Sequence, residues 1–112
     1  MASAWLSLIL LIATSVGVTA QQNAQFAEVR SFLDIWERCV VEKAKRYAKT
    51  PDAAEFIVKV ATIACGEEKK ATSEALTRAG QTTAVLLATL NVFEQDITQA
   101  AAVAVLEARS KP

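Results

Sequence analysis

The chain has 112 residues, enough for one small domain, with 12 basic residues, 12 acidic residues and no histidine. The zero net charge creates no long-range field that favours nucleic acid or an anionic membrane, and the lack of imidazole excludes Ser-His-Asp and Cys-His catalysis. We therefore expect no catalytic residue, no cofactor, no metal site and no nucleic-acid partner.

The first twenty residues carry no charged side chain, and Trp5 to Val18 form an apolar run that is too short to span a membrane. Small residues up to Ala20 precede polar glutamines, as at a site of signal-peptide cleavage. The pattern predicts a cleavable signal peptide over 1–20, export to the periplasm or out of the cell, and a helical domain over 21–112. An uncleaved anchor is the alternative.

Apolar residues recur every three or four positions in segment 22–49, which predicts a helix with one buried face. Trp36 lies at the centre of this face, so we expect it in the core and not in a ligand site. The predicted buried face consists of Phe26, Val29, Leu33, Trp36, Val40, Ala44 and Tyr47.

The next segment begins with Thr50-Pro51-Asp52, where proline ends one helix and suits the first turn of another. We expect Thr50 to cap a second helix over 52–79, with Gly80 as its terminator. Gly66 interrupts the apolar spacing of this segment. We expect a continuous or kinked helix there, and a complete break at Gly66 is the alternative.

The third predicted helix, over 82–108, carries more apolar surface than a three-helix core requires. A helix that is apolar on several sides requires a second partner, so we expect a protein partner or a second copy to bind this helix. Membrane contact and binding of unfolded clients are left open, as is burial of the extra valines. The expected interaction surface is Val85, Val92 and Val103, with Leu87, Val105 and Leu106 elsewhere around the helix.

The two cysteines, Cys39 and Cys65, are candidates for a disulfide because thiols usually pair in oxidising compartments. Each lies thirteen residues from Asp52, so two helices folded back at that turn would bring the thiols level. Short connections force neighbouring helices to run antiparallel. The predicted fold is all-α, an up-down-up three-helix bundle with one inter-helix disulfide.

The close carboxylate pairs do not converge on one substrate atom, since Glu67 and Glu68 point about 100° apart on a helix. Glu68 alone falls in phase with the apolar face of the second helix. Two interpretations are open for it. Either a kink at Gly66 turns the carboxylate outward, or it is buried and paired with a lysine or arginine across the bundle.

The order Trp36-x-x-Cys39, followed by a helix that starts at proline and ends at Cys65, resembles short exported helical proteins of bacterial envelopes, mostly without an assigned function. The resemblance implies a two-cysteine helical hairpin and export, and no catalytic residue. In size, export and cysteine number the chain is also similar to acid-activated periplasmic chaperones. The expected function is a non-enzymatic envelope module that binds a partner or itself, with a periplasmic chaperone as the alternative.

Overall fold

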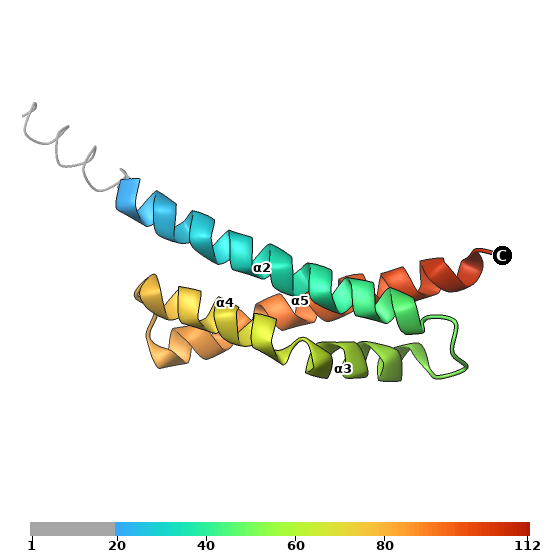
Figure 1. Cartoon of the computed structure of the whole chain (residues 1–112). Helices are drawn as coiled ribbons and strands as arrows, with labels where there is room; N and C mark the ends of the chain where they lie inside the picture. The colour runs from blue at the N-terminus through green and yellow to red at the C-terminus, as the bar shows by residue number, and fades with distance from the viewer. Residues whose placement is uncertain (1–19) are drawn as a thin grey trace, which may run out of the picture.

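The computed structural model describes residues 20–112, and within this range every regular element is an α helix. The all-helical prediction is therefore confirmed for the described part of the chain. The predicted signal peptide lies, except for Ala20, outside the described residues. The helices are α2 (Ala20–Tyr47), α3 (Ala54–Ala64), α4 (Gly66–Arg78) and α5 (Thr83–Ser110) (Figure 1).

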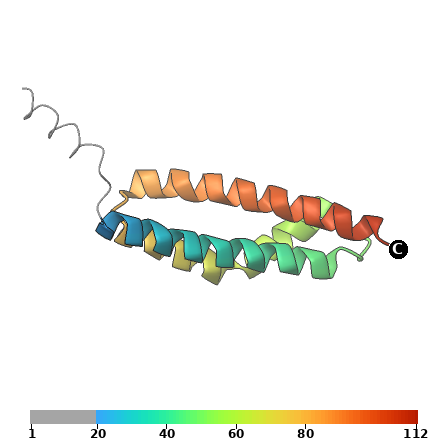
Figure 2. The same ribbon diagram turned by 90° about the horizontal axis from the view of Figure 1, so that it is seen from above.

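The helices lie side by side as an elongated bundle. In Figure 1, α2 runs in one direction, α3 and α4 return along it, and α5 runs back beside them. The view from above places α5 along one side and α2 along the other (Figure 2). The helix α2 contacts all three of the others, and α5 also packs against α3.

The core between the helices combines one large aromatic side chain with many small ones. Trp36 is fully buried, and its indole Nε1 has no hydrogen-bond acceptor among residues 20–112. Alanine side chains are small, so the helix backbones approach one another closely and the small core is densely packed. The fully or nearly fully buried apolar residues around Trp36 are Val40, Ala44, Ala48, Ile57, Ala61, Cys65, Ala75, Leu76, Ile97, Ala101 and Val105.

The predicted apolar faces agree with the observed core in the middle of the helices and depart from it at the ends. Phe26 and Tyr47 are 63% and 44% exposed, although both fall on the predicted face of α2. Val105, expected away from the core, is fully buried. The reason is that α5 packs against both α2 and α3, so its buried face is wider than one helix partner would make it.

The segment predicted as one helix over 52–79 forms two helices with Cys65 between them. The Cys65 N–H donates to the carbonyl oxygens of Ala61 and Thr62, both at 3.2 Å, which tightens the last turn of α3. The Cys65 carbonyl accepts from Lys69 N–H at 3.2 Å and opens the first turn of α4. The change of direction therefore comes one residue before Gly66.

The C-terminal end of α4 depends on glycine. Gly80 has φ of +91°, a left-handed conformation that residues with a Cβ rarely adopt. The N–H groups of Gly80 and Gln81 donate to the carbonyls of Thr77 and Leu76 at 3.0 and 3.2 Å. This is the hydrogen-bond pattern of a Schellman motif, and it ends the helix at the predicted glycine.

The turn between α2 and α3 differs from the predicted cap. The N-cap of α3 is Ala53, without a side-chain hydrogen bond, and Thr50 does not cap it. Instead the Thr50 hydroxyl donates to the Tyr47 carbonyl at 2.8 Å and closes the end of α2. Arg109 of α5 donates to carbonyl oxygens of the same turn, so the far end of the chain holds it in place.

Within the described part of the chain, two ion pairs join α4 to its neighbours. Arg78 reaches Glu28 of α2 at 2.6 Å, and its guanidinium lies 5.8 Å from the centre of the Phe32 ring. Lys69 reaches Glu94 of α5 at 2.8 Å. Both pairs are partly exposed, so they position α4 more than they stabilise the bundle.

Candidate functional site

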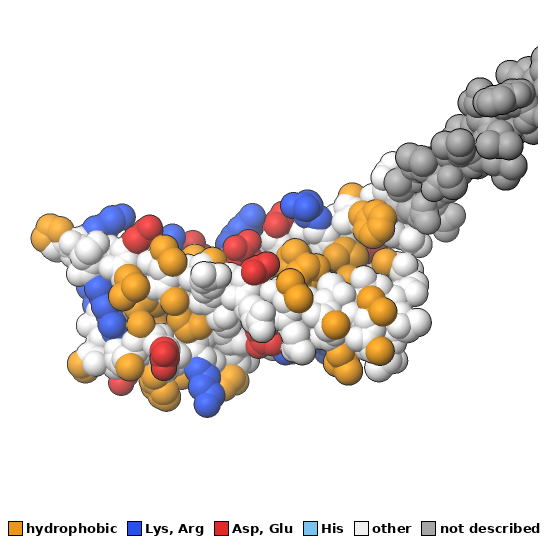
Figure 3. All heavy atoms as spheres, turned by 180° about the vertical axis from the view of Figure 1, so that it is seen from behind, with side chains coloured by type: hydrophobic (Ala, Val, Ile, Leu, Met, Phe, Trp, Pro, Cys, Tyr) orange, Lys and Arg blue, Asp and Glu red, His pale blue; other side chains and the backbone are white. Residues whose placement is uncertain are grey.

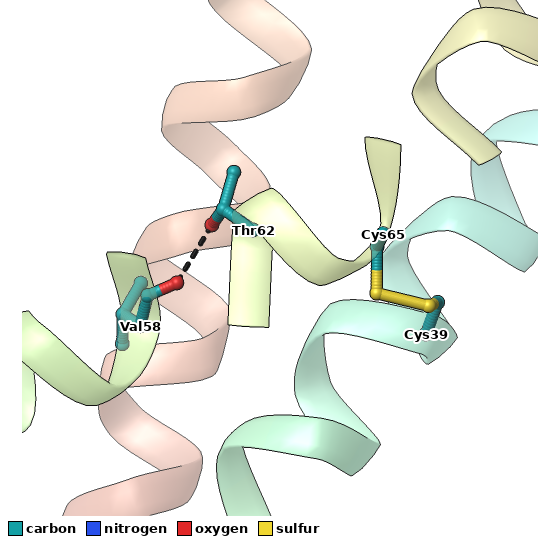
Figure 4. The surroundings of a disulfide bond; sticks show 4 residues. All are labelled: Cys39, Val58, Thr62 and Cys65. Atoms are coloured by element: carbon teal, nitrogen blue, oxygen red, sulfur yellow. Dashed lines mark hydrogen bonds between the residues drawn. A yellow bond between two sulfur atoms is a disulfide. The ribbon is translucent and has the colours of Figure 1, made fainter. Parts of the chain in front are cut away.

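The disulfide between Cys39 and Cys65 joins the middle of α2 to the junction of α3 and α4 (Figure 4). The two Cα atoms are 6.1 Å apart, and no cysteine within residues 20–112 is free. The predicted pairing is confirmed. Just before the bridge, the Thr62 hydroxyl donates to the Val58 carbonyl at 2.8 Å, an interaction that bends helices.

Glu68 lies beside this disulfide because it follows Cys65 by three residues, close to one turn of helix. A carboxylate oxygen of Glu68 and the sulfur atoms of Cys39 and Cys65 all lie within 4.8 Å of one another. Sequence reasoning considered Glu68 and the cysteines separately and missed their proximity. The three-residue spacing was the signal that could have revealed it.

One oxygen of Glu68, Oε2, is buried and has no hydrogen-bond partner within the described part of the chain. A glutamate at this position of a helix usually accepts from the N–H of the residue three earlier. Here the N–H of Cys65 already donates to two carbonyls of α3. The oxygen is therefore left without its usual donor, on a carboxylate that lies beside the sulfur atoms.

Neither interpretation of Glu68 from the sequence describes this arrangement. The carboxylate is half-buried instead of turned outward. It takes part in none of the ion pairs found within residues 20–112, where the neighbouring Lys69 makes the contact across the bundle. The three-residue spacing from Cys65 thus places Glu68 against the disulfide, between the outward and the paired arrangements that were expected.

An open groove runs along α2 next to the disulfide and Glu68. Three cationic side chains share this groove with Glu68 and one further carboxylate, Glu42, while Glu67 lines a second recess beside Glu68. The groove is lined by Ile35, Arg38, Cys39, Glu42, Lys43, Arg46 and Glu68.

The second candidate is the surface of α5 that faces away from the bundle. Val85, Val92 and Val103 are 51%, 55% and 50% exposed. Leu106, expected elsewhere around the helix, is 59% exposed and falls on the same side. Seen from the side on which α5 lies, hydrophobic side chains gather toward both ends, with other side chains between them (Figure 3). We define the α5 outer face as Val85, Ala88, Val92, Gln95, Gln99, Val103 and Leu106.

A shorter apolar stripe lies on α3 and was not expected from the sequence. Phe56 and Ile63 are 55% and 70% exposed, and Val60 between them is 37% exposed. Their spacing of four and three residues puts them on one side of the helix. Phe56 and Val60 also line a small recess with Tyr47, with room for about 110 Å³.

Comparisons of the chain with protein-family models, with curated proteins and with solved structures found no match in any of the three. Within residues 20–112, no helix has the length and apolar character needed to cross a membrane. The chemistry of the two candidate regions is therefore the basis for a functional proposal.

Proposed function

We propose that the chain is an exported, non-enzymatic module, an up-down-up bundle behind a cleaved signal peptide, that binds a second copy of itself through the α5 outer face. The observation that carries the proposal is the exposure of Val85, Val92, Val103 and Leu106, each at least half exposed on one helix. A disulfide is typical of proteins in oxidising compartments, which supports export.

Charge supports a second copy as the occupant of this face. The seven side chains of the α5 outer face are apolar or uncharged, so two such faces meet without opposing like charges. Asp96 and Glu107 are exposed on α5, and a basic flank of the kind that anchors a helix on an anionic membrane is lacking there. The face thus fits a neutral protein surface better than a lipid one.

The order of side chains along α5 also suits a two-fold axis. When two copies of α5 run antiparallel about a point between Gln95 and Asp96, Val85 lies opposite Leu106 of the other copy. In the same register Val92 lies opposite Gln99. An isologous dimer of this kind uses the same patch on both subunits.

The expected affinity is modest. Covering the exposed half of each of the four large side chains is worth about 1 kcal/mol, or about 8 kcal/mol for the dimer. Association itself costs about 4 to 15 kcal/mol in lost freedom of motion. At the lower end of that cost about 4 kcal/mol remains, so we expect a weak dimer that forms only as the protein concentration approaches the millimolar range.

The test is light scattering of protein purified from the periplasm of an expression host, over a range of concentrations. Wild-type protein should move from monomer to dimer mass, and the variant Val85→Glu, Val92→Glu, Val103→Glu should stay monomeric. The matched control is Phe56→Glu with Ile63→Glu, which charges the α3 stripe and should dimerise normally. A triple variant that still reaches the dimer mass of the wild-type protein would contradict the proposal. Export is tested separately, by mass spectrometry that shows whether the amino terminus has been cleaved after the signal peptide.

A periplasmic chaperone is the second candidate, supported by the additional exposed stripe of Phe56, Val60 and Ile63. An acid-activated chaperone would dissociate at acid pH. Dissociation would expose its apolar surface, which would then bind an unfolded client and suppress its aggregation. The same scattering experiment at acid pH, with reduced insulin as client, separates the two functions. A dimer that persists in acid and leaves client aggregation unchanged favours the self-association module.

A further inference from the structure

The disulfide, the unpartnered carboxylate oxygen and the cationic groove meet at one place, the junction of α3 and α4. We propose that Cys39, Cys65 and Glu68 form a redox-controlled site for a thiophilic divalent cation of the zinc type. The intact disulfide keeps the site closed to metal. Reduction of the disulfide opens it.

The ligand set suits zinc. Two thiolates and one carboxylate are common zinc ligands, and three protein ligands with a water as the fourth form an open tetrahedral site. In such a site the ligand atoms lie about 3.3 to 3.8 Å apart, given metal–sulfur bonds of about 2.3 Å and metal–oxygen bonds of about 2.1 Å. The sulfur and carboxylate atoms already lie within 4.8 Å of one another.

The backbone leaves room for the change from a sulfur–sulfur bond to a bridging metal. The Cα atoms of Cys39 and Cys65 are 6.1 Å apart, so side-chain rotation can separate the sulfurs to the spacing of two zinc ligands. Glu68 needs little movement, because its carboxylate already lies beside both sulfurs. Its buried Oε2 has no partner within the described residues that metal binding would have to displace.

The charges around the site favour its metal-bound form. Two thiolates and one carboxylate around a divalent cation leave one net negative charge. Arg38, Lys43 and Arg46 line the adjacent groove and offset that charge, with Glu42 as the one further carboxylate there. Cys65 also directly precedes the first turn of α4, where the helix dipole favours a negative group such as a thiolate.

The steps balance with a dithiol reductant as the co-reactant. The reductant supplies two electrons and two protons to the Cys39–Cys65 bond and itself becomes a disulfide, leaving two thiols on the protein. Metal binding then releases the two thiol protons, as each sulfur forms a bond to the cation. In the reverse direction, the oxidised (disulfide) form of the reductant takes two electrons from the two thiolates, the Cys39–Cys65 bond forms again, and the metal is released.

The experiment uses Co²⁺, a spectroscopic substitute for zinc, added to purified protein that has been reduced with a dithiol and freed of excess reductant. Reduced wild-type protein should bind one equivalent and show sulfur-to-cobalt charge-transfer absorption, which Zn²⁺ then removes. Protein with an intact disulfide should show no such absorption. Reduced protein without a cobalt–thiolate band would overturn the proposal.

The variant Glu68→Gln tests the third ligand, with Glu67→Gln as its matched control on the adjacent exposed residue. Glu68→Gln should weaken Co²⁺ binding by more than about tenfold, while Glu67→Gln stays within about twofold of wild type. Equal losses in both variants, or none in either, would reject Glu68 as a ligand and the site with it.

Circular dichroism, which measures helix content and the melting temperature, provides a second readout in case the reduced chain is partly unfolded. Zn²⁺ should raise the melting temperature of the reduced wild-type protein and leave the oxidised protein unchanged. A reduced protein whose helix content and melting temperature are unchanged by Zn²⁺ also contradicts the proposal, whatever its folded fraction.

Discussion

The side chain of Arg109 donates through Nε to the carbonyl oxygen of Ala48 at 2.7 Å, which ties the last turn of α5 to the end of α2. Its second nitrogen donates to the carbonyl of Thr50 at 3.2 Å and to that of Asp52. A cation at a helix C-terminus also complements the helix dipole. One side chain thus closes the turn on which the α2–α3 hairpin depends.

Removal of this contact should destabilise the protein. We expect Arg109→Ala to lower the free energy of unfolding by about 1 to 2 kcal/mol, because it removes charge-assisted hydrogen bonds that are partly exposed to water. Thermal unfolding should show a fall of several degrees. Arg109→Lys should recover only part of it, since an ammonium lacks the planar fork of donors. Lys111→Ala is the control, and an equal effect there would contradict a specific role for Arg109.

The disulfide should supply a large share of the stability of the domain. Its bridge closes a sequence separation of 26 residues, which restricts the unfolded chain by about 3 to 4 kcal/mol on the loop-entropy model. We expect Cys39→Ser with Cys65→Ser to melt well below wild type in metal-free buffer. Added reductant should lower the melting temperature of the wild-type protein alone. Identical melting curves with and without reductant would show that the bridge contributes nothing.

The two described glycines should respond in opposite directions to alanine. Gly80→Ala should destabilise by about 1 kcal/mol, because φ of +91° is unfavourable once a Cβ is present. Gly66→Ala should stabilise by up to about 1 kcal/mol, since the added Cβ meets no atom within 4 Å and alanine favours the first turn of α4. Urea unfolding measures both, and equal signs would contradict the assigned backbone roles.

The ion pair between Arg78 and Glu28 should be measurable but small. Its side chains are 49% and 39% exposed, so a double-mutant cycle with alanine should give a coupling of about 0.5 to 1 kcal/mol that falls as salt is added. The control cycle uses Lys45 with Glu42, which lie 3.8 Å apart on the same helix and are more exposed. Its coupling should be near zero. A larger coupling in the control would contradict the role of Arg78 as a clamp between α2 and α4.

The sequence was sufficient to predict the helical class from regular apolar spacing, and the disulfide from the expected export of a chain with two cysteines at matching distances from the turn. Apolar residues every three or four positions define the faces, and Cys39 and Cys65 lie at equal distances from Asp52. These relations depend on helix geometry and chain length alone. Predictions from these relations are correct wherever the helices remain straight.

The departures arise where tertiary packing sets the local structure. Val105 is buried because α3 packs against α5 in addition to α2, a contact that the spacing within α5 does not contain. The break falls at Cys65 because the bridge and the tight last turn of α3 act together there, whereas propensity alone pointed to Gly66. The position of Glu68 beside the sulfurs follows from its spacing of three residues from Cys65, once the bridge has formed.

The burial of Trp36 has a practical consequence, because it is the only tryptophan among residues 20–112 and has no water contact. Trp36 precedes Cys39 by three residues, close to one turn of helix, so this buried indole lies near the sulfur bridge along α2. Its fluorescence should be blue-shifted in the folded protein and move to longer wavelength as water enters. Folding, bridge opening and metal uptake can therefore be followed optically in unlabelled protein.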